Sequence, residues 1–212
     1  MKKLFLSLSL LASFAFASNE FSIDVGTNKS SLENKAKFGK KEQNLHKVDF
    51  GYNYINSDFL VKTKVGVGTG HIDDNFDLNF WEFEGLFGFE YGDQNKLRIL
   101  PVGLGFLAYD DSDDELDIVY YKLGVDSINS YGKFDLNLGA AYQFTINNKE
   151  TYKGEKFKPK GYEVYIGGDY KLTDSISAGV TFKYFDVKAN NTYLKYGLKD
   201  GLSVMAGLKF KF

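Results

Sequence analysis

Apolar and polar residues alternate along most of this 212-residue chain. The clearest run is the last one, in which Ser203, Met205, Gly207, Lys209 and Lys211 separate the apolar positions Leu202, Val204, Ala206, Leu208, Phe210 and Phe212. A period of two residues is typical of a β-strand with one apolar and one polar face. About ten residues is also the length that a tilted strand needs to cross a bilayer. The C-terminal run therefore predicts a membrane-crossing strand.

The same period predicts nine further strands before it. They lie near residues 21–26, 47–54, 59–69, 81–90, 96–108, 119–126, 134–146, 162–170 and 176–184. The alternation is least regular in 96–108, where Pro101 has no N–H to donate to a neighbouring strand. We expect a bulge at that proline.

Long and short connections alternate between these strands. The long polar segments are 28–45, 70–78, 109–115, 147–160 and 189–201, and the short turns lie at 56–58, 92–95, 129–132 and 173–174. Residues 193–199 carry some strand character, but an eleventh strand would place the two chain ends on opposite sides, so we interpret them as loop. Long loops at one end and short turns at the other are typical of membrane barrels.

The pattern thus predicts an all-β fold, an antiparallel up-and-down transmembrane β-barrel of ten strands, with eight or twelve strands as alternatives. A secreted β-sandwich also alternates apolar and polar faces. Its strands are usually five or six residues long, whereas those predicted here reach ten or more. A closed barrel also leaves no strand edge unpaired in lipid.

The N-terminus has the features of a secretory signal peptide. Two lysines precede an apolar segment, Leu4 to Phe16, that is too short to span a membrane, and Ala15-Phe16-Ala17 fits a cleavage site. We expect residues 1–17 to be removed, which lowers the net charge from −2 to −4. A chain with this negative net charge gives no indication of a nucleic-acid partner. The chain has no cysteine, so neither a disulfide framework nor lipoprotein acylation is expected.

A signal peptide, amphipathic strands and a final strand that ends in phenylalanine together resemble the small outer-membrane β-barrel proteins of Gram-negative bacteria, a porin-like superfamily. The resemblance covers residues 18–212 and implies a location in the outer membrane with both chain ends in the periplasm. It implies that Phe210 and Phe212 form the assembly signal for the barrel assembly machinery, after passage with periplasmic chaperones. It also implies contact with membrane lipids and lipopolysaccharide, and it leaves the oligomeric state open.

If the apolar face meets lipid, the polar face lines the lumen. The charged positions expected there are Asp49, Lys62, Lys64, Glu82, Glu84, Lys122, Asp126, Asp135, Glu163, Asp169, Lys183 and Lys209. Eight strands enclose an interior filled by side chains, whereas about sixteen leave an aqueous channel, so ten strands lie near the filled end. Charges of both signs in so narrow a space should pair across it. Inward glycines would either leave room for water or ease strand coiling, so a narrow pore and a plugged lumen both stay open.

Candidate catalytic and metal-binding residues are few. The two histidines are His46 and His71, and His71 precedes Asp73, near the rim where ten-stranded outer-membrane proteases carry their catalytic Asp–His pair. This chain has no adjacent Asp–His pair, and an exposed loop histidine beside acids is common. The acidic segment 110–115 lacks the glycine and distal glutamate of an EF-hand loop. We therefore expect no catalytic residue, cofactor or metal site.

Three functional hypotheses follow from the sequence. The first is a non-enzymatic porin-like barrel, either a narrow passive pore or a largely plugged structural barrel. The second is a surface-interaction barrel whose lysine-rich loops, 28–45 and 147–160, bind lipopolysaccharide or another surface. The third is an outer-rim hydrolase that uses His71 and Asp73.

Overall fold

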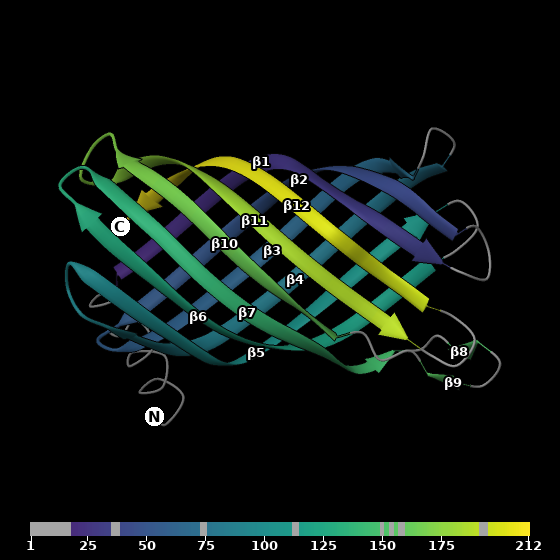
Figure 1. Cartoon of the computed structure of the whole chain (residues 1–212). Coiled ribbons are helices and arrows are strands. Elements are labelled where there is room, and N and C mark those ends of the chain that lie inside the picture. Colours follow the sequence, from purple (N-terminus) through teal and green to yellow (C-terminus); the bar gives the residue numbers. More distant parts are fainter. Residues whose placement is uncertain are drawn as a thin grey trace, which may run out of the picture.

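The computed structural model describes residues 18–34, 39–72, 76–111, 115–148, 151–152, 155–156, 160–190 and 195–212. These residues form a closed antiparallel barrel of ten strands, which confirms the predicted fold class and strand number (Figure 1). The barrel strands are β1 (Ser18–Asn34), β2 (Gly39–Asn56), β3 (Phe59–Ile72), β4 (Phe76–Tyr91), β5 (Asn95–Asp111), β6 (Glu115–Tyr131), β7 (Phe134–Asn148), β10 (Lys160–Lys171), β11 (Ile176–Asn190) and β12 (Lys195–Lys211). A separate two-stranded sheet joins β8 (Thr151–Tyr152) to β9 (Glu155–Lys156).

The first and last strands close the barrel. Pairing between β1 and β12 begins at Glu20 and Lys211 and continues along both strands. At the chain end, the Phe212 N–H donates to the Asn19 carbonyl at 2.8 Å, and the Asn19 N–H donates to the Phe212 carbonyl at 3.3 Å. The backbone of Phe212 therefore completes the seam between the two ends of the chain. Whether Phe210 and Phe212 also act as an assembly signal stays a prediction.

The distribution of side chains is inverted relative to a soluble protein. Large apolar residues such as Trp81, which is 59% exposed, cover the outer surface on almost every strand. The buried residues are mostly polar or charged, and they include Lys47, Asp49, Glu84 and Lys122. A continuous apolar exterior around a polar interior is the arrangement that a lipid environment requires. Among the described residues, no helix is long and apolar enough to cross a membrane.

The short connections, the start of β1 and the end of β12 lie at one end of the barrel, which we call the turn end (Figure 1). The opposite end is called the loop end. The predicted short turns are confirmed near residues 57–58, 92–94, 132–133 and 172–175. Gly92 and Gly132 adopt φ values of 90° and 64° in two of these turns, a conformation that glycine tolerates without strain.

The predicted bulge in β5 is confirmed. The pairing register of β5 shifts against β4 between Ile99 and Val102 and against β6 between Leu100 and Leu104. Pro101 lies inside both shifts, where its missing N–H removes a hydrogen bond from the ladder. A second bulge lies in β12 around Asp200, whose φ is 51°.

The predicted loop boundaries were wrong at the loop end. Most of segment 28–45 is strand, because β1 continues to Asn34 and β2 starts at Gly39. Segments 70–78, 109–115 and 189–201 are shortened in the same way, and β12 begins at Lys195 inside the last of them. Segment 147–160 contains β8 and β9. Beyond the apolar belt the outward residues are polar as well, as at Asn44 and His46 in β2, so the strand continues without the apolar–polar alternation that predicts it.

The exposed apolar belt predicts where a charge harms folding. Val65 lies on the outer face of β3 and is 41% exposed, and Phe50 and Phe83 flank it on the neighbouring strands. Val65→Lys should lower the free energy of unfolding from lipid vesicles by about 2–4 kcal/mol, because a lysine near the bilayer centre is poorly solvated. The measurement is a urea titration followed by the fluorescence of Trp81, the only tryptophan in the chain. Thr69→Lys, on the same strand nearer the loop end, is the matched control, and an equal loss there would contradict the assignment of the belt.

Candidate functional site

All twelve lumen positions expected from the sequence carry side chains in the barrel interior. Eleven of them line a cavity of about 310 Å³ that receives residues from all ten strands. Glu82 lines a smaller cavity of about 60 Å³ nearer the loop end. Their proposed role in selectivity stays a prediction.

Ion pairs connect strands that are not hydrogen-bonded neighbours. The Lys122 ammonium on β6 lies 2.7 Å from the Glu84 carboxylate on β4 and 2.7 Å from the Glu163 carboxylate on β10. Farther toward the turn end, Lys62 on β3 lies 2.8 Å from Asp126 on β6. Because these pairs cross the lumen, they hold the strands that they join at a fixed distance from one another.

The pairs extend into one continuous chain of contacts. Lys64 lies 2.9 Å and Lys47 lies 3.3 Å from the Glu82 carboxylate, and the Tyr120 hydroxyl donates to Glu84 at 3.0 Å and to Glu82 at 3.4 Å. From Glu84 the chain continues through Lys122 and Glu163 to Lys183, the last contact being 3.5 Å. We call this layer the partition; its members are Lys47, Lys64, Glu82, Glu84, Tyr120, Lys122, Glu163 and Lys183.

The centre of the partition is deeply buried, and each of its four lysines contacts at least one of its three glutamates. The side chains of Lys47 and Lys122 are 2% and 4% exposed. An unpaired charge at such a depth would cost several kcal/mol, and the pairing offsets this cost. The partition is thus held together by the same interactions that allow charges to occupy the lumen.

The partition separates the two cavities. Lys47, Glu163 and Lys183 line both the larger cavity and the smaller one. Toward the loop end the smaller cavity is bounded by Phe80 and Phe185, and the Lys47 ammonium lies 5.4 Å from the Phe80 ring centre. Three charged side chains are therefore shared by the linings of the two spaces.

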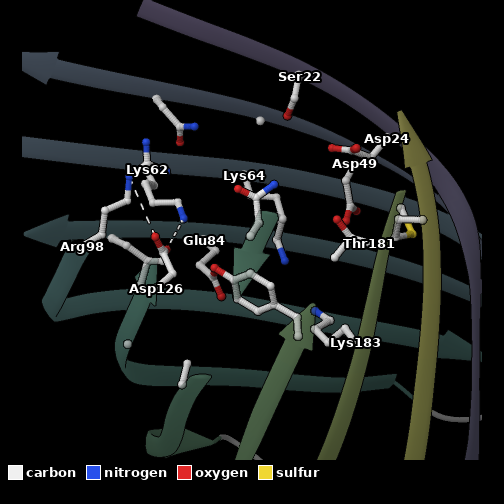
Figure 2. Close-up of a pocket in the computed structure, with 18 of the residues that line it drawn as sticks. Ser22, Asp24, Asp49, Lys62, Lys64, Glu84, Arg98, Asp126, Thr181 and Lys183 are labelled. Atoms are coloured by element: carbon white, nitrogen blue, oxygen red, sulfur yellow. Dashed lines mark hydrogen bonds and ion pairs between the residues drawn. The ribbon is translucent and has the colours of Figure 1, made fainter. Parts of the chain in front are cut away.

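Charged residues also surround the larger cavity, which lies on the turn side of the partition. In Figure 2, Asp24 and Asp49 lie together on one wall, whereas Lys62, Arg98 and Asp126 lie together on the other. Glu90 accepts from Arg98 at 2.7 Å and from Lys96 at 2.6 Å near the turn end. Asp169 pairs with Lys209 and accepts from the Asn137 amide.

Several inward glycines hold space for neighbouring side chains. A Cβ at Gly66 would lie 2.6 Å from the Asp49 carboxylate, and a Cβ at Gly105 or Gly139 would overlap the ring of Tyr120 or Tyr165. The larger residue on one strand therefore fills the gap left by a glycine on the next. The sequence suggested room for water or easier coiling, and the observed reason is close packing between adjacent strands.

Some lumen residues were not recognised as site residues in the sequence. Arg98 follows the irregular start of β5, where Pro101 disturbs the alternation, although its spacing from Lys96 places both on one face. The alternation places Tyr120 on the polar face beside Lys122, but neither Tyr120 nor Tyr165 was named as a lumen residue because the expected set was limited to charged side chains. A register that places each opposite an inward glycine would have identified them.

The candidate catalytic residues do not form a site among the described residues. His46 and His71 are exposed on the loop-end parts of β2 and β3. Asp73, the proposed partner of His71, and Ser112 to Asp114 of the acidic segment lie outside the described residues. No group of three or more His, Cys, Asp or Glu side chains in the described part of the chain could hold a metal ion.

Comparisons with known proteins concern the fold alone. No protein-family model matches the chain, and no curated protein matches its sequence. Among solved structures, the outer membrane protease OmpT from Escherichia coli has a TM-score of 0.49 at 12% identity, covering 92% of this chain and 96% of that chain. The translocator domain of the autotransporter NalP from Neisseria meningitidis has a TM-score of 0.48 at 10% identity, covering 98% and 96%. Neisserial surface protein A has a TM-score of 0.40 at 13% identity, covering 92% and 97%.

The structure combines a closed ladder of strands with an apolar exterior and a charged interior. The chain is a transmembrane β-barrel. Aromatic residues lie on its outer surface toward both ends, with Trp81 toward the loop end and Tyr91 and Tyr170 toward the turn end.

The partition predicts a large loss of stability when its pairing is broken from one side. Lys122→Met leaves Glu84 and Glu163 buried without their shared cation and should cost about 3–5 kcal/mol. The triple variant Glu84→Gln, Lys122→Met, Glu163→Gln removes the buried charges together and should recover most of that loss. Unfolding in urea from lipid vesicles measures both.

Lys29→Met is the matched control for this comparison. Lys29 lies 3.6 Å from Glu42 on the surface and its side chain is 65% exposed. Removing such a pair should change stability by about 1 kcal/mol or less. A Lys122→Met variant no less stable than Lys29→Met would contradict the role of the partition.

Proposed function

We propose that this outer-membrane barrel is porin-like in architecture but closed at rest, with the partition blocking passive diffusion between the cell exterior and the periplasm. The observation that carries the proposal is the continuous chain of contacts from Lys64 on β3 to Lys183 on β11, which lies between two separate cavities. An ion that crossed this layer would have to displace a buried cation from two carboxylates. The cost of breaking such a pair favours low conductance.

The wall of the barrel itself leaves enough room for a path. The cavity on the turn side reaches about 310 Å³, and its lining extends from Lys122 in the partition to Asp135 and Ser177 beside the turns. The block is made of side chains, and among the described residues no backbone segment lies across the lumen. A barrel closed in this way is a plugged structural barrel. Removing a few of the blocking side chains would convert it into a pore.

The other two hypotheses have weaker support. Surface binding through segments 28–45 and 147–160 stays a prediction, because parts of both lie outside the described residues. Hydrolysis at the outer rim would need His71 to act with Asp73, which also lies outside them. The ion-paired lumen favours a non-enzymatic barrel.

Single-channel recording in planar lipid bilayers tests the proposal. The folded wild-type protein should give no resolved conductance steps at moderate voltage. The variant Glu84→Ala, Lys122→Ala, Glu163→Ala should give steady steps, because it removes the bridge between β4, β6 and β10 and the volume of its side chains. Heat-modifiable migration on a gel establishes that each protein is folded before it is recorded.

Glu42→Ala is the control, since Glu42 lies on the exposed part of β2 away from the partition. It should remain as silent as the wild type. Large, steady steps from the wild-type barrel, equal to those of the triple variant, would refute a lumen closed by the partition.

A further inference from the structure

The cavity on the turn side of the partition has one more negative than positive charge. Eight carboxylates and seven cationic side chains line it. Most of these groups form ion pairs, but among the described residues Glu20 and Asp24 have none. Glu20 accepts from the Asn53 amide at 2.8 Å, whereas Asp24 has only a hydrogen bond with Ser22. Lys209, whose charge acts on Asp24 from the same wall, forms its ion pair with Asp169 instead. The cavity thus contains an acidic side chain that no described cation neutralises.

The neighbour of Asp24 across the sheet is a second acid. Asp24 on β1 pairs directly with Asp49 on β2 in the strand register. Like charges opposite each other destabilise a sheet. Asp49 is buried, and although its Oδ2 lies 2.9 Å from Lys47, its Oδ1 has no hydrogen-bond partner. One buried carboxylate oxygen therefore lacks a donor beside an acid that lacks a cation.

Glycines on both sides let the two carboxylates lean apart. Gly207 pairs with Asp24 and Gly66 pairs with Asp49. A Cβ at Gly66 would lie 2.6 Å from Asp49 Oδ1, and a Cβ at Gly207 would overlap Asp24 Oδ1. Each carboxylate thus occupies the space over a glycine of the next strand. This arrangement opens the wall of the cavity between the two acids, which Figure 2 shows beside each other.

The surroundings favour an organic cation over a metal ion. In the described part of the chain, no group of three or more acidic or histidine side chains could hold a metal. The hydroxyl groups of Ser22 and Thr181 line the same cavity and can accept N–H donors. The buried side chains of Leu86, Leu100 and Met205 supply apolar lining. An ammonium group has three donors, and a short alkyl chain attached to it would contact this apolar lining.

We propose that the turn-side cavity binds a small protonated alkylamine, with the ammonium group between Asp24 and Asp49 and the alkyl chain toward Leu86, Leu100 and Met205. The cavity volume of about 310 Å³ lies within the range of small-molecule sites. Binding would supply the cation that Asp24 lacks, next to the second negative charge of Asp49. The site does not require the partition to be closed, so it goes beyond the proposed function and can fail or succeed independently of it.

The test uses three probes of the same chain length that differ in charge: n-butylamine, n-butanol and butyrate. Each is titrated at neutral pH into the folded, isotope-labelled barrel in detergent micelles, and amide chemical shifts are followed by NMR. Butylamine should cause saturable shifts at Asp24, Asp49 and Gly207. Butanol and butyrate should leave those amides unchanged, which separates binding in the cavity from partition into the micelle.

Two variants of opposite expected effect make the assignment specific. Asp24→Asn keeps the shape but removes the charge, and it should weaken butylamine binding roughly tenfold or more, as the loss of one charged hydrogen bond does. Lys209→Gln removes the competing cation and should strengthen binding. Glu42→Gln, on the exposed part of β2, is the control and should bind as the wild type does.

Two results would overturn the proposal. One is the absence of saturable shifts with butylamine in the wild-type barrel. The other is an unchanged affinity in a folded Asp24→Asn variant, which would place the amine elsewhere. Because each variant is first assayed for heat-modifiable migration, a loss of binding is not confused with a loss of the fold. Conductance plays no part in either result.

Discussion

The constraint on which the structure depends is that every backbone N–H and C=O in the hydrocarbon layer needs a partner within the protein. In this chain the condition is met by pairing β12 with β1, down to the reciprocal hydrogen bonds between Asn19 and Phe212. Closure leaves no strand edge facing lipid. It also divides the side chains into two environments, because successive residues of each strand point to opposite faces.

The same division places polar and charged side chains in the lumen, where they need partners. Ten strands enclose an interior too narrow for bulk water in its middle, and the inward positions are polar and charged. Charges there are stable only if they are paired, so Lys122 lies between Glu84 and Glu163 and links three strands that are not hydrogen-bonded neighbours. Glycines such as Gly66 allow the bulkier side chains of adjacent strands to lie against the wall.

The partition and the cavity on its turn side differ in how their charged side chains are paired. In the partition, lysines and glutamates alternate along a continuous chain of contacts, so the positive and negative groups satisfy one another. On the wall formed by β1 and β2, two acids are cross-strand neighbours; Lys47 contacts Asp49, whereas Lys209 contacts Asp169 and leaves Asp24 without an ion pair. The first arrangement supports the proposed closed layer, and the second supports the proposed site for an organic cation.

The alternation of residues such as Leu208 and Lys209 by itself determined the fold class, favoured ten strands and placed twelve charged residues on the inward face, because period-two amphipathicity is a local property of each strand. It also located the bulge at Pro101, whose missing N–H is a property of the residue. It did not identify Arg98 as a lumen residue, and it did not determine the ends of strands beyond the apolar belt, where the alternation is lost, as in Lys195 to Gly201. Nor did it determine which charges pair, because the contact of Lys62 with Asp126 depends on registers that barrel closure sets across four strands. The partition and the Asp24–Asp49 pair are therefore decided by the tertiary structure, since a side chain that crosses a lumen meets partners that are distant in sequence.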